Sequence, residues 1–292
     1  MKILKSKIYQ RRYEEDWDHI IKPKNGWFDI NIGEIFRYRD LIYMFIRRDF
    51  VTYYKQTILG PLWFIIQPLV NTLVFTIIFG KIANISTDST PPFLFYMTGT
   101  IAWNYFATSL TATSNTFVQN ANIFGKVYFP RLTVPVSHVI INLLQFGIQF
   151  VIFMGFWSWF KLQGAEFHLG YLIFAIPLVL LQMAVLGLGF GILISSLTTK
   201  YRDLTFAMSF GVQLWMYATP VVYPLSVIPE KYHMLASLNP MTSVIECFRG
   251  AFLGVNSLQP VHIAISIVVT FIIFVIGIIL FSRIEKTFMD TV

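Results

Sequence analysis

The chain has 292 residues, of which 55% are hydrophobic and 13% are charged. An ordinary soluble domain has about 25% charged residues, so this composition excludes a soluble globular protein. The formal net charge of +7 would suggest nucleic acid as a partner of a soluble protein. Here, basic residues beside an anionic lipid surface explain it. The sequence therefore predicts a membrane protein that contacts lipids and binds no nucleic acid.

The apolar residues gather in six blocks, each of which is long enough to cross a membrane. A bilayer core about 30 Å thick needs about 20 apolar residues per helical span. We expect spans at Leu62 to Ala83, Phe93 to Thr116, Leu132 to Phe160, Leu169 to Leu197, Leu204 to Tyr223 and Val261 to Phe281. An eight-helix alternative would split residues 225–254 into two more spans, but each half is short and carries charge. The predicted fold is an all-α polytopic membrane protein with six transmembrane helices.

The basic residues predict the orientation of these spans. Of the 22 Lys and Arg residues, only Lys81, Lys161, Lys231 and Arg249 fall on one side of the alternating connections. Basic residues favour the cytoplasmic side of a membrane. Both termini, and the connections after the second and fourth spans, are therefore expected to be cytoplasmic.

Two segments precede the first span. Residues 1–33 mix basic and acidic side chains and are expected to form a solvated cytoplasmic extension. In residues 34–60, apolar side chains recur at helical spacing and charged ones fall on the opposite face. The apolar set is Ile35, Tyr38, Ile42, Phe45, Ile46 and Phe50, and the charged set is Arg37, Asp40, Arg47 and Arg48. This pattern predicts an amphipathic helix in the membrane surface, which is either a plain anchor or a partner contact.

Residues 119–131 form a short segment between the second and third spans that cannot bury its own apolar side chains. It is interrupted at Gly125 and ends at Pro130, and Ile123, Phe124, Val127 and Tyr128 are expected to be exposed. We predict that it docks on a cytoplasmic partner; the alternative is a capped loop on lipid headgroups. The candidate contact residues are Asn122, Ile123, Phe124, Lys126, Tyr128 and Arg131, together with Arg47 and Arg48.

The spans contain many uncharged polar and aromatic side chains. Amides are costly when they face lipid, so they are expected to face other helices or a water-filled path. Aromatic rings and amides together suit a neutral glycan better than an ion, although interfacial belts and contacts between helices are the alternatives. The candidate channel residues are Trp63, Gln67, Asn71, Tyr96, Trp103, Gln213, Trp215 and Tyr217.

Residues 225–254, between the fifth and sixth spans, are predicted to form a re-entrant hairpin. The halves Pro229 to Leu238 and Met241 to Leu253 are apolar but too short to cross a membrane. They would be hinged at Asn239 and Pro240. Glu246 and Arg249, spaced i,i+3, can pair on one helical face. A static plug or a surface hairpin is the alternative.

No set of residues suited to catalysis or metal binding is visible. The five His residues are scattered, Cys247 is the only cysteine, and no Gly-x-x-x-x-Gly-Lys-Ser/Thr run is present. The sequence therefore disfavours an enzyme, and we expect no metal site and no cofactor or nucleotide site in this chain.

Four motifs in order carry a resemblance to a known family. They are Lys55-Gln56 through Leu62-Trp63 with Gln67-Pro68; residues 120–131, which end in Phe129-Pro130-Arg131; residues 200–204 with 213–224; and Asn239-Pro240 with Glu246 and Arg249. Over residues 34–283 the chain resembles the polysaccharide-exporting ABC transporter permeases, which export O-antigen, capsule or teichoic acid.

This resemblance implies an ABC-2 type transmembrane domain over residues 61–292. Two copies of the chain would assemble with two copies of a nucleotide-binding ABC ATPase, which holds ATP and Mg²⁺. Residues 119–131 would be the coupling helix, the amphipathic helix would also touch the ATPase, and residues 225–254 would be a periplasmic gate. The expected substrate is a lipid-linked polysaccharide, and the expected location is the bacterial inner membrane. A lipid or drug exporter of the same superfamily, or a passive channel, is the alternative.

Overall fold

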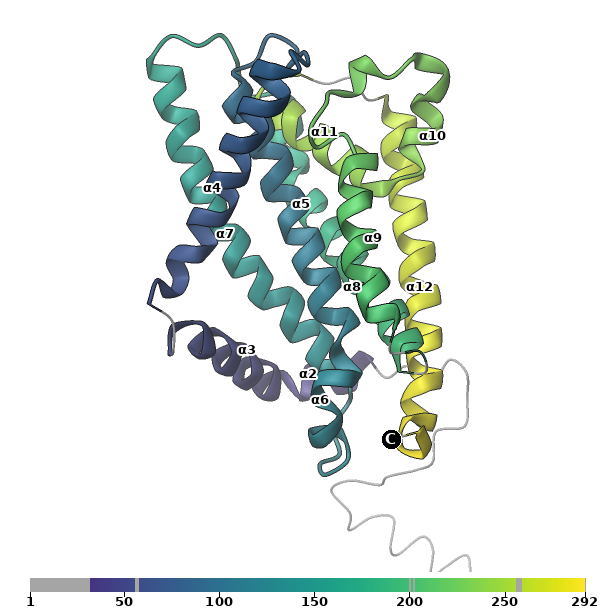
Figure 1. The fold of residues 1–292 in the computed structure, drawn as a ribbon. Helices are drawn as coiled ribbons and strands as arrows, with labels where there is room; N and C mark the ends of the chain where they lie inside the picture. Colours follow the sequence, from purple (N-terminus) through teal and green to yellow (C-terminus); the bar gives the residue numbers. More distant parts are fainter. Residues whose placement is uncertain (1–31, 56–57, 200, 202, 256–258, 292) are drawn as a thin grey trace, which may run out of the picture.

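The computed structural model describes residues 32–55, 58–199, 201, 203–255 and 259–291, and every regular element in these ranges is a helix. Long helices run side by side in a bundle, and α2 and α3 lie across one end of it (Figure 1). The predicted all-α class is confirmed. The predicted extension 1–33 lies outside the described residues except for its last two, and Lys200 and Arg202 also lie outside them.

Four stretches within the described ranges are long and apolar enough to cross a membrane: Gly60–Ile82, Thr133–Leu162, Tyr171–Thr198 and Pro260–Glu285. The first comprises the short 3-10 helix η1 (Gly60–Leu62), α4 (Trp63–Phe75) and the π-helix η2 (Thr76–Ile82). The others are α7 (Thr133–Leu162), the 3-10 helix η3 (Tyr171–Ala175) with α8 (Ile176–Thr198), and α12 (Pro260–Thr291). These four agree with the first, third, fourth and sixth predicted spans.

The remaining two predicted spans are helices that do not meet the same criteria, so the six-span count is not confirmed. Helix α5 (Pro92–Ser114) buries 16 of its 23 residues. Because other helices surround it, it can carry more Thr, Ser and Asn than a lipid-facing helix. Helix α9 (Leu204–Ala218) has 15 residues and ends before the predicted Tyr223. Thr219 has an extended backbone there, as expected for a residue that precedes a proline.

The core of the bundle forms where α5 packs against α7 and α8, and α8 packs against α12. Glycines allow these helices to approach closely. A Cβ atom on Gly191 of α8 would lie 2.4 Å from the Thr113 Cβ of α5, and one on Gly277 of α12 would lie 2.5 Å from the Gly189 carbonyl oxygen of α8. Phe106, Leu110, Met183 and Leu186 fill the space between α5 and α8 and are fully buried.

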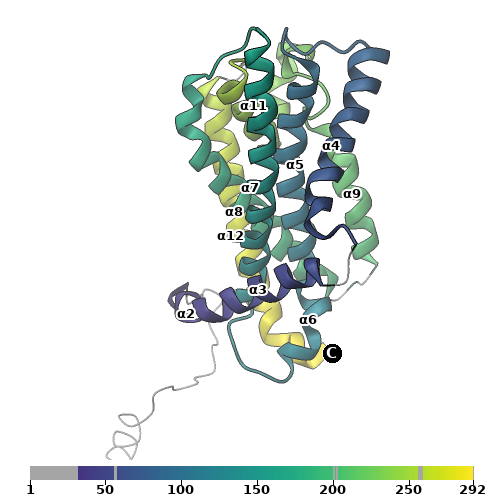
Figure 2. The same ribbon diagram turned by 90° about the vertical axis from the view of Figure 1, so that its left-hand side faces the viewer.

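Residues 34–60, predicted to form one amphipathic interface helix, are not a single helix, and their helical part ends before residue 60. Helix α2 (Ile32–Arg37) and helix α3 (Arg39–Tyr54) are separated by a turn at Tyr38. Tyr38 and Phe45 both pack on one aromatic cluster. Figures 1 and 2 show α3 running across the ends of the long helices, where it packs on α7.

The predicted hairpin contains α10 (His233–Ser237) and α11 (Pro240–Phe252), which follow the 3-10 turns η4 (Leu225–Val227) and η5 (Glu230–Tyr232). Neither α10 nor α11 is long enough to cross a membrane. All 13 residues of α11 are buried. Two hydrogen bonds hold the end of α11. The Gly170 amide, in the connection before α8, donates to the Ala251 carbonyl at 2.9 Å, and Trp157 Nε1 of α7 donates to the Phe252 carbonyl at 2.7 Å.

Candidate functional site

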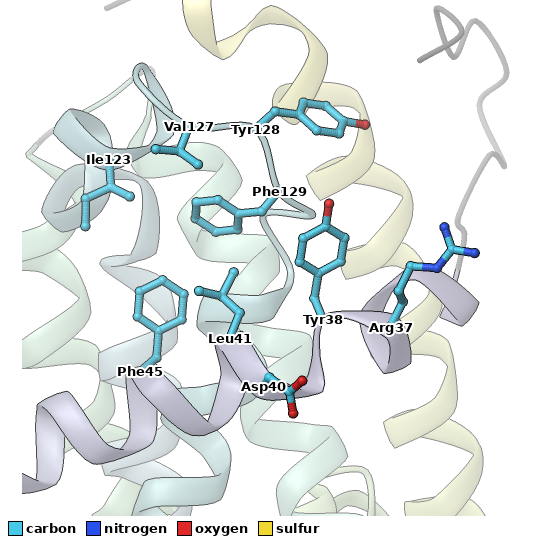
Figure 3. Close-up of a pocket in the computed structure, with 9 residues that line it drawn as sticks. All are labelled: Arg37, Tyr38, Asp40, Leu41, Phe45, Ile123, Val127, Tyr128 and Phe129. Carbon is cyan, nitrogen blue, oxygen red and sulfur yellow. The ribbon is translucent and has the colours of Figure 1, made fainter. Parts of the chain in front are cut away.

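A pocket of about 520 Å³ lies where α2 and α3 meet the loop that follows α6 (Thr116–Phe124). In Figure 3 the side chains of Leu41, Phe45 and Phe129 point toward one another from the two sides, and Arg37 and Asp40 lie at the edge. The full lining is Arg37, Tyr38, Asp40, Leu41, Phe45, Ile123, Val127, Tyr128 and Phe129. The pocket therefore joins the two segments that the sequence predicted to contact a partner.

An aromatic cluster adjoins this pocket and shares Phe45 and Phe129 with it. The Phe124 and Phe129 ring centroids are 5.6 Å apart, Phe45 and Phe129 are 5.8 Å apart, and Phe117 stacks on Phe281 of α12 at 4.8 Å. The prediction that Phe124 is exposed is wrong, because only 5% of this residue is accessible. The cluster that buries it also includes Phe45 of α3 and Phe281 of α12, which are distant in the sequence.

The tip of the same loop is exposed, as predicted. Val127 is 60% exposed and Tyr128 is 63% exposed. Asn122 and Lys126 are also exposed, whereas Ile123 is half-buried. Backbone hydrogen bonds from Lys126 and Val127 to the Ile123 carbonyl, at 3.1 Å and 3.2 Å, fold this tip back on the end of α6. Val127 and Tyr128 therefore form a small exposed apolar surface beside the pocket.

Two of the predicted basic contact residues are engaged within the chain. The Arg131 backbone amide donates to Glu285 Oε1 at 3.2 Å, and its guanidinium donates to the Glu285 carbonyl, so Arg131 fastens the loop to α12. Burial lowers the pKa of Arg131, and the Glu285 carboxylate opposes that shift. Arg48 Nε donates to Asp49 Oδ1 at 2.7 Å, and its guanidinium lies over the Phe45 ring. Arg47 is exposed.

The predicted channel residues fall into two groups, and the first forms stripes on α4 and α9. Trp63 and Gln67 are exposed and Asn71 is half-buried at four-residue spacing on α4; Gln213 and Tyr217 are exposed at the same spacing on α9. Both helices pack on α5. Figures 1 and 2 together place α4 and α9 on the same side of the bundle, one on each side of α5.

The second group packs inside the chain instead. Tyr96 is fully buried and Trp103 is 3% exposed. Trp103 and Trp215 meet edge-on at 6.2 Å, and Trp215 also meets Phe190 of α8 at 4.9 Å. Trp103, Trp215 and Phe190 thus bring α5, α9 and α8 into contact. The sequence could not distinguish Tyr96, Trp103 and Trp215, which pack inside the chain, from the exposed stripes, because both groups contain aromatic residues.

The predicted gate residues all belong to α11 or to its N-cap. Asn239 caps this helix by accepting from the Met241 amide at 3.2 Å, and it donates to Thr219 Oγ1 at 2.8 Å. Pro240 is the first helical residue. The i,i+3 pairing is confirmed, since Arg249 Nη1 lies 3.0 Å from Glu246 Oε1 with both side chains buried. Arg249 also donates to the Val221 carbonyl at 2.8 Å and lies over the Phe95 ring at 3.6 Å.

A polar network joins α11 to the bundle, and its residues Ser266 and Thr270 were not among the predicted site residues. Gln182 Nε2 of α8 donates to Ser266 Oγ of α12 at 2.6 Å, and Ser266 donates to the Pro240 carbonyl at 3.0 Å. Thr270 lies within 3.3 Å of Gln182. The i,i+4 spacing of Ser266 and Thr270 within an apolar helix was the available signal. Across the described ranges, no group of three His, Cys, Asp or Glu side chains could hold a metal ion.

Apolar helices long enough to cross a membrane, with a further helix across their ends and an exposed loop beside it, define a helical membrane domain. Residues 40–253 match the ABC-2 type transporter family, and the chain belongs to this family. It is similar to the O-antigen export system permease protein RfbA of Klebsiella pneumoniae, at 29% identity over 260 residues, which cover 89% of this chain and 96% of that protein. The protein of the same name from Myxococcus xanthus is 27% identical over 227 residues, which cover 76% and 83% of the two chains.

Proposed function

We propose that the chain is the permease subunit of an ATP-driven exporter that moves a lipid-linked polysaccharide, of the O-antigen kind, across the bacterial inner membrane. The observation that carries the proposal is the match to O-antigen permeases along nearly their whole length. The exposed polar and aromatic stripes of α4 and α9 support it, because they suit hydroxyl groups and sugar rings better than ions.

ATP hydrolysis is assigned to a separate ABC ATPase, which holds ATP and Mg²⁺ and docks at the pocket between α2, α3 and the loop after α6. Figure 1 shows α6 and this loop extending beyond α3 at the end of the bundle, so a water-soluble partner could reach this part of the chain. Arg37 lines the pocket, and exposed Lys126 precedes Val127 in the loop. A partner with an apolar contact surrounded by acidic residues would complement it.

The translocation path is assigned to the exposed faces of α4 and α9 from two copies of the chain. In this arrangement α5 and α9 are the two further spans, which gives six spans per copy with both termini in the cytoplasm. Amide side chains such as Gln67 and Gln213 are exposed in the single chain and would face the path rather than lipid. Closure of the ATPase pair would move α3 and the loop after α6, and α10 and α11 would gate the outer end.

The direct test is deletion of the gene, followed by localisation of the polymer. We expect lipid-linked polysaccharide to accumulate inside the cell and surface polymer to disappear, and the intact gene should restore export. Lipids and small drugs should be exported normally. Unchanged surface polymer in the deletion strain would refute the proposed substrate.

A further inference from the structure

A close contact between α3 and α7 involves two partly buried polar side chains whose facing atoms are too far apart for a hydrogen bond. Asp49 Oδ2 of α3 lies 3.7 Å from His138 Nδ1 of α7, and the two side chains are only 20% and 12% exposed. Within the part of the chain that the structure describes, Asp49 Oδ2 and His138 Nε2 are buried without a hydrogen-bond partner. A buried polar atom without a hydrogen-bond partner lowers the stability of the arrangement that contains it. The contact as it stands therefore does not stabilise the packing of α3 on α7.

The two carboxylate oxygens of Asp49 face different partners. Its Oδ1 accepts from Arg48 Nε at 2.7 Å, so the carboxylate is bound on one side to its own helix. Its other oxygen faces α7. Helix α4, which also packs on α7, has no ionisable side chain, and Lys161 at the far end is the only other one on α7. His138 is therefore the one group on these two helices that can draw Asp49 toward the spans.

A small movement would complete the missing bond. Donation from an imidazole Nδ1–H to a carboxylate oxygen needs a separation of about 2.7–2.9 Å, which is roughly 1 Å shorter than the present distance. The neutral ring suffices if Nδ1 carries its hydrogen, so no proton has to be taken up. A shift of that size lies within the translations by which packed helices switch between two arrangements.

The Asp49–His138 contact lies on the same helix as the pocket. Helix α3 bears one wall of the pocket, through Leu41 and Phe45, and the same helix reaches α7 at Asp49. We propose that Asp49 and His138 are positioning residues that pass movement of α3 to α7: when the docked partner displaces α3, the Asp49–His138 hydrogen bond closes and the two helices move together. This inference rests on the proposed function, because it assumes a partner that moves α3.

The test compares export with ATP hydrolysis in Asp49→Ala, His138→Ala and the double variant, each expressed in the deletion strain. Surface polymer is normalised to the assembled complex, and ATP hydrolysis is measured on the purified complex. We expect each single variant to assemble and hydrolyse ATP within twofold of the unmutated protein, and to export about tenfold less polymer, as for a typical coupling between sites. The double variant should lose no more than either single one, because both changes remove one shared interaction.

Conservative variants separate this role from simple packing. Asp49→Asn retains an acceptor oxygen, and His138→Asn retains a donor near the Nδ1 position, so both should restore most of the export even where an alanine variant assembles poorly. Glu166→Gln, an exposed acid-to-amide change before α8, is the matched control and should export normally. The inference is overturned if both alanine variants export within twofold of normal, or if their losses multiply in the double variant. Absence of export with the unmutated gene would instead refute the proposed function.

Discussion

Replacement of Glu246 by alanine is expected to destabilise the protein by about 3–5 kcal/mol, because it leaves a buried charge without its partner. Arg249 is 1% exposed, and its ion pair with Glu246 is 3.0 Å long. The Val221 and Tyr223 carbonyls also accept from Arg249, but they do not neutralise its charge. Denaturation of the purified protein in detergent, followed by intrinsic tryptophan fluorescence, measures the loss.

The double variant Glu246→Leu with Arg249→Met provides the control for this prediction. Apolar replacements of a whole buried ion pair are often neutral or stabilising, so the double variant should recover part of the stability lost by Glu246→Ala. Recovery should be incomplete, since the Val221 and Tyr223 carbonyls lose their donor. A cost below about 1 kcal/mol for Glu246→Ala would show that the pair does not hold α11 in place.

Replacement of Val127 by aspartate is expected to weaken binding of the ATPase at least about 30-fold while the permease stays folded. Val127 is 60% exposed and lines the pocket, so the fold tolerates the new charge. In the complex that charge would be buried without a partner, at a cost of about 2–5 kcal/mol. Copurification of the ATPase with tagged permease, quantified at several salt concentrations, measures the effect.

Two further variants distinguish loss of the docking surface from a general effect of the charge and from unfolding. Val227→Asp makes the same change at a residue that is 57% exposed in η4, far along the chain from the pocket, and it should leave the ATPase bound. Phe124→Asp should instead unfold this end of the protein, because Phe124 lies within the aromatic cluster. If Val127→Asp keeps the ATPase as tightly as the unmutated chain does, the pocket is not the docking site.

Much of the fold was predictable because membrane-spanning helices are local features of a sequence. Length and apolarity alone located the helices at Gly60–Ile82, Thr133–Leu162, Tyr171–Thr198 and Pro260–Glu285. The error at the end of α9 was avoidable, since Pro220 marks the residue before it as extended. The composition of α5 depends on which helices surround it, and that is a property of the assembled bundle.

The same distinction applies to the candidate site. The Glu246–Arg249 pair was predicted because its partners are one helical turn apart, and it is observed. The exposure of Phe124 was predicted wrongly, because its burial depends on Phe129 and on the cluster that includes α3 and α12. The Asp49–His138 contact joins two helices that are far apart in the chain, and no periodicity within either helix reveals it.

The measurement that tests the central claim most directly is purification of the tagged protein from its native membrane in mild detergent, followed by identification and quantification of the associated proteins. The account predicts an ABC ATPase in equal amount to the permease, and its loss from the Val127→Asp sample. Intact, folded permease that carries no ATPase under these conditions would contradict it.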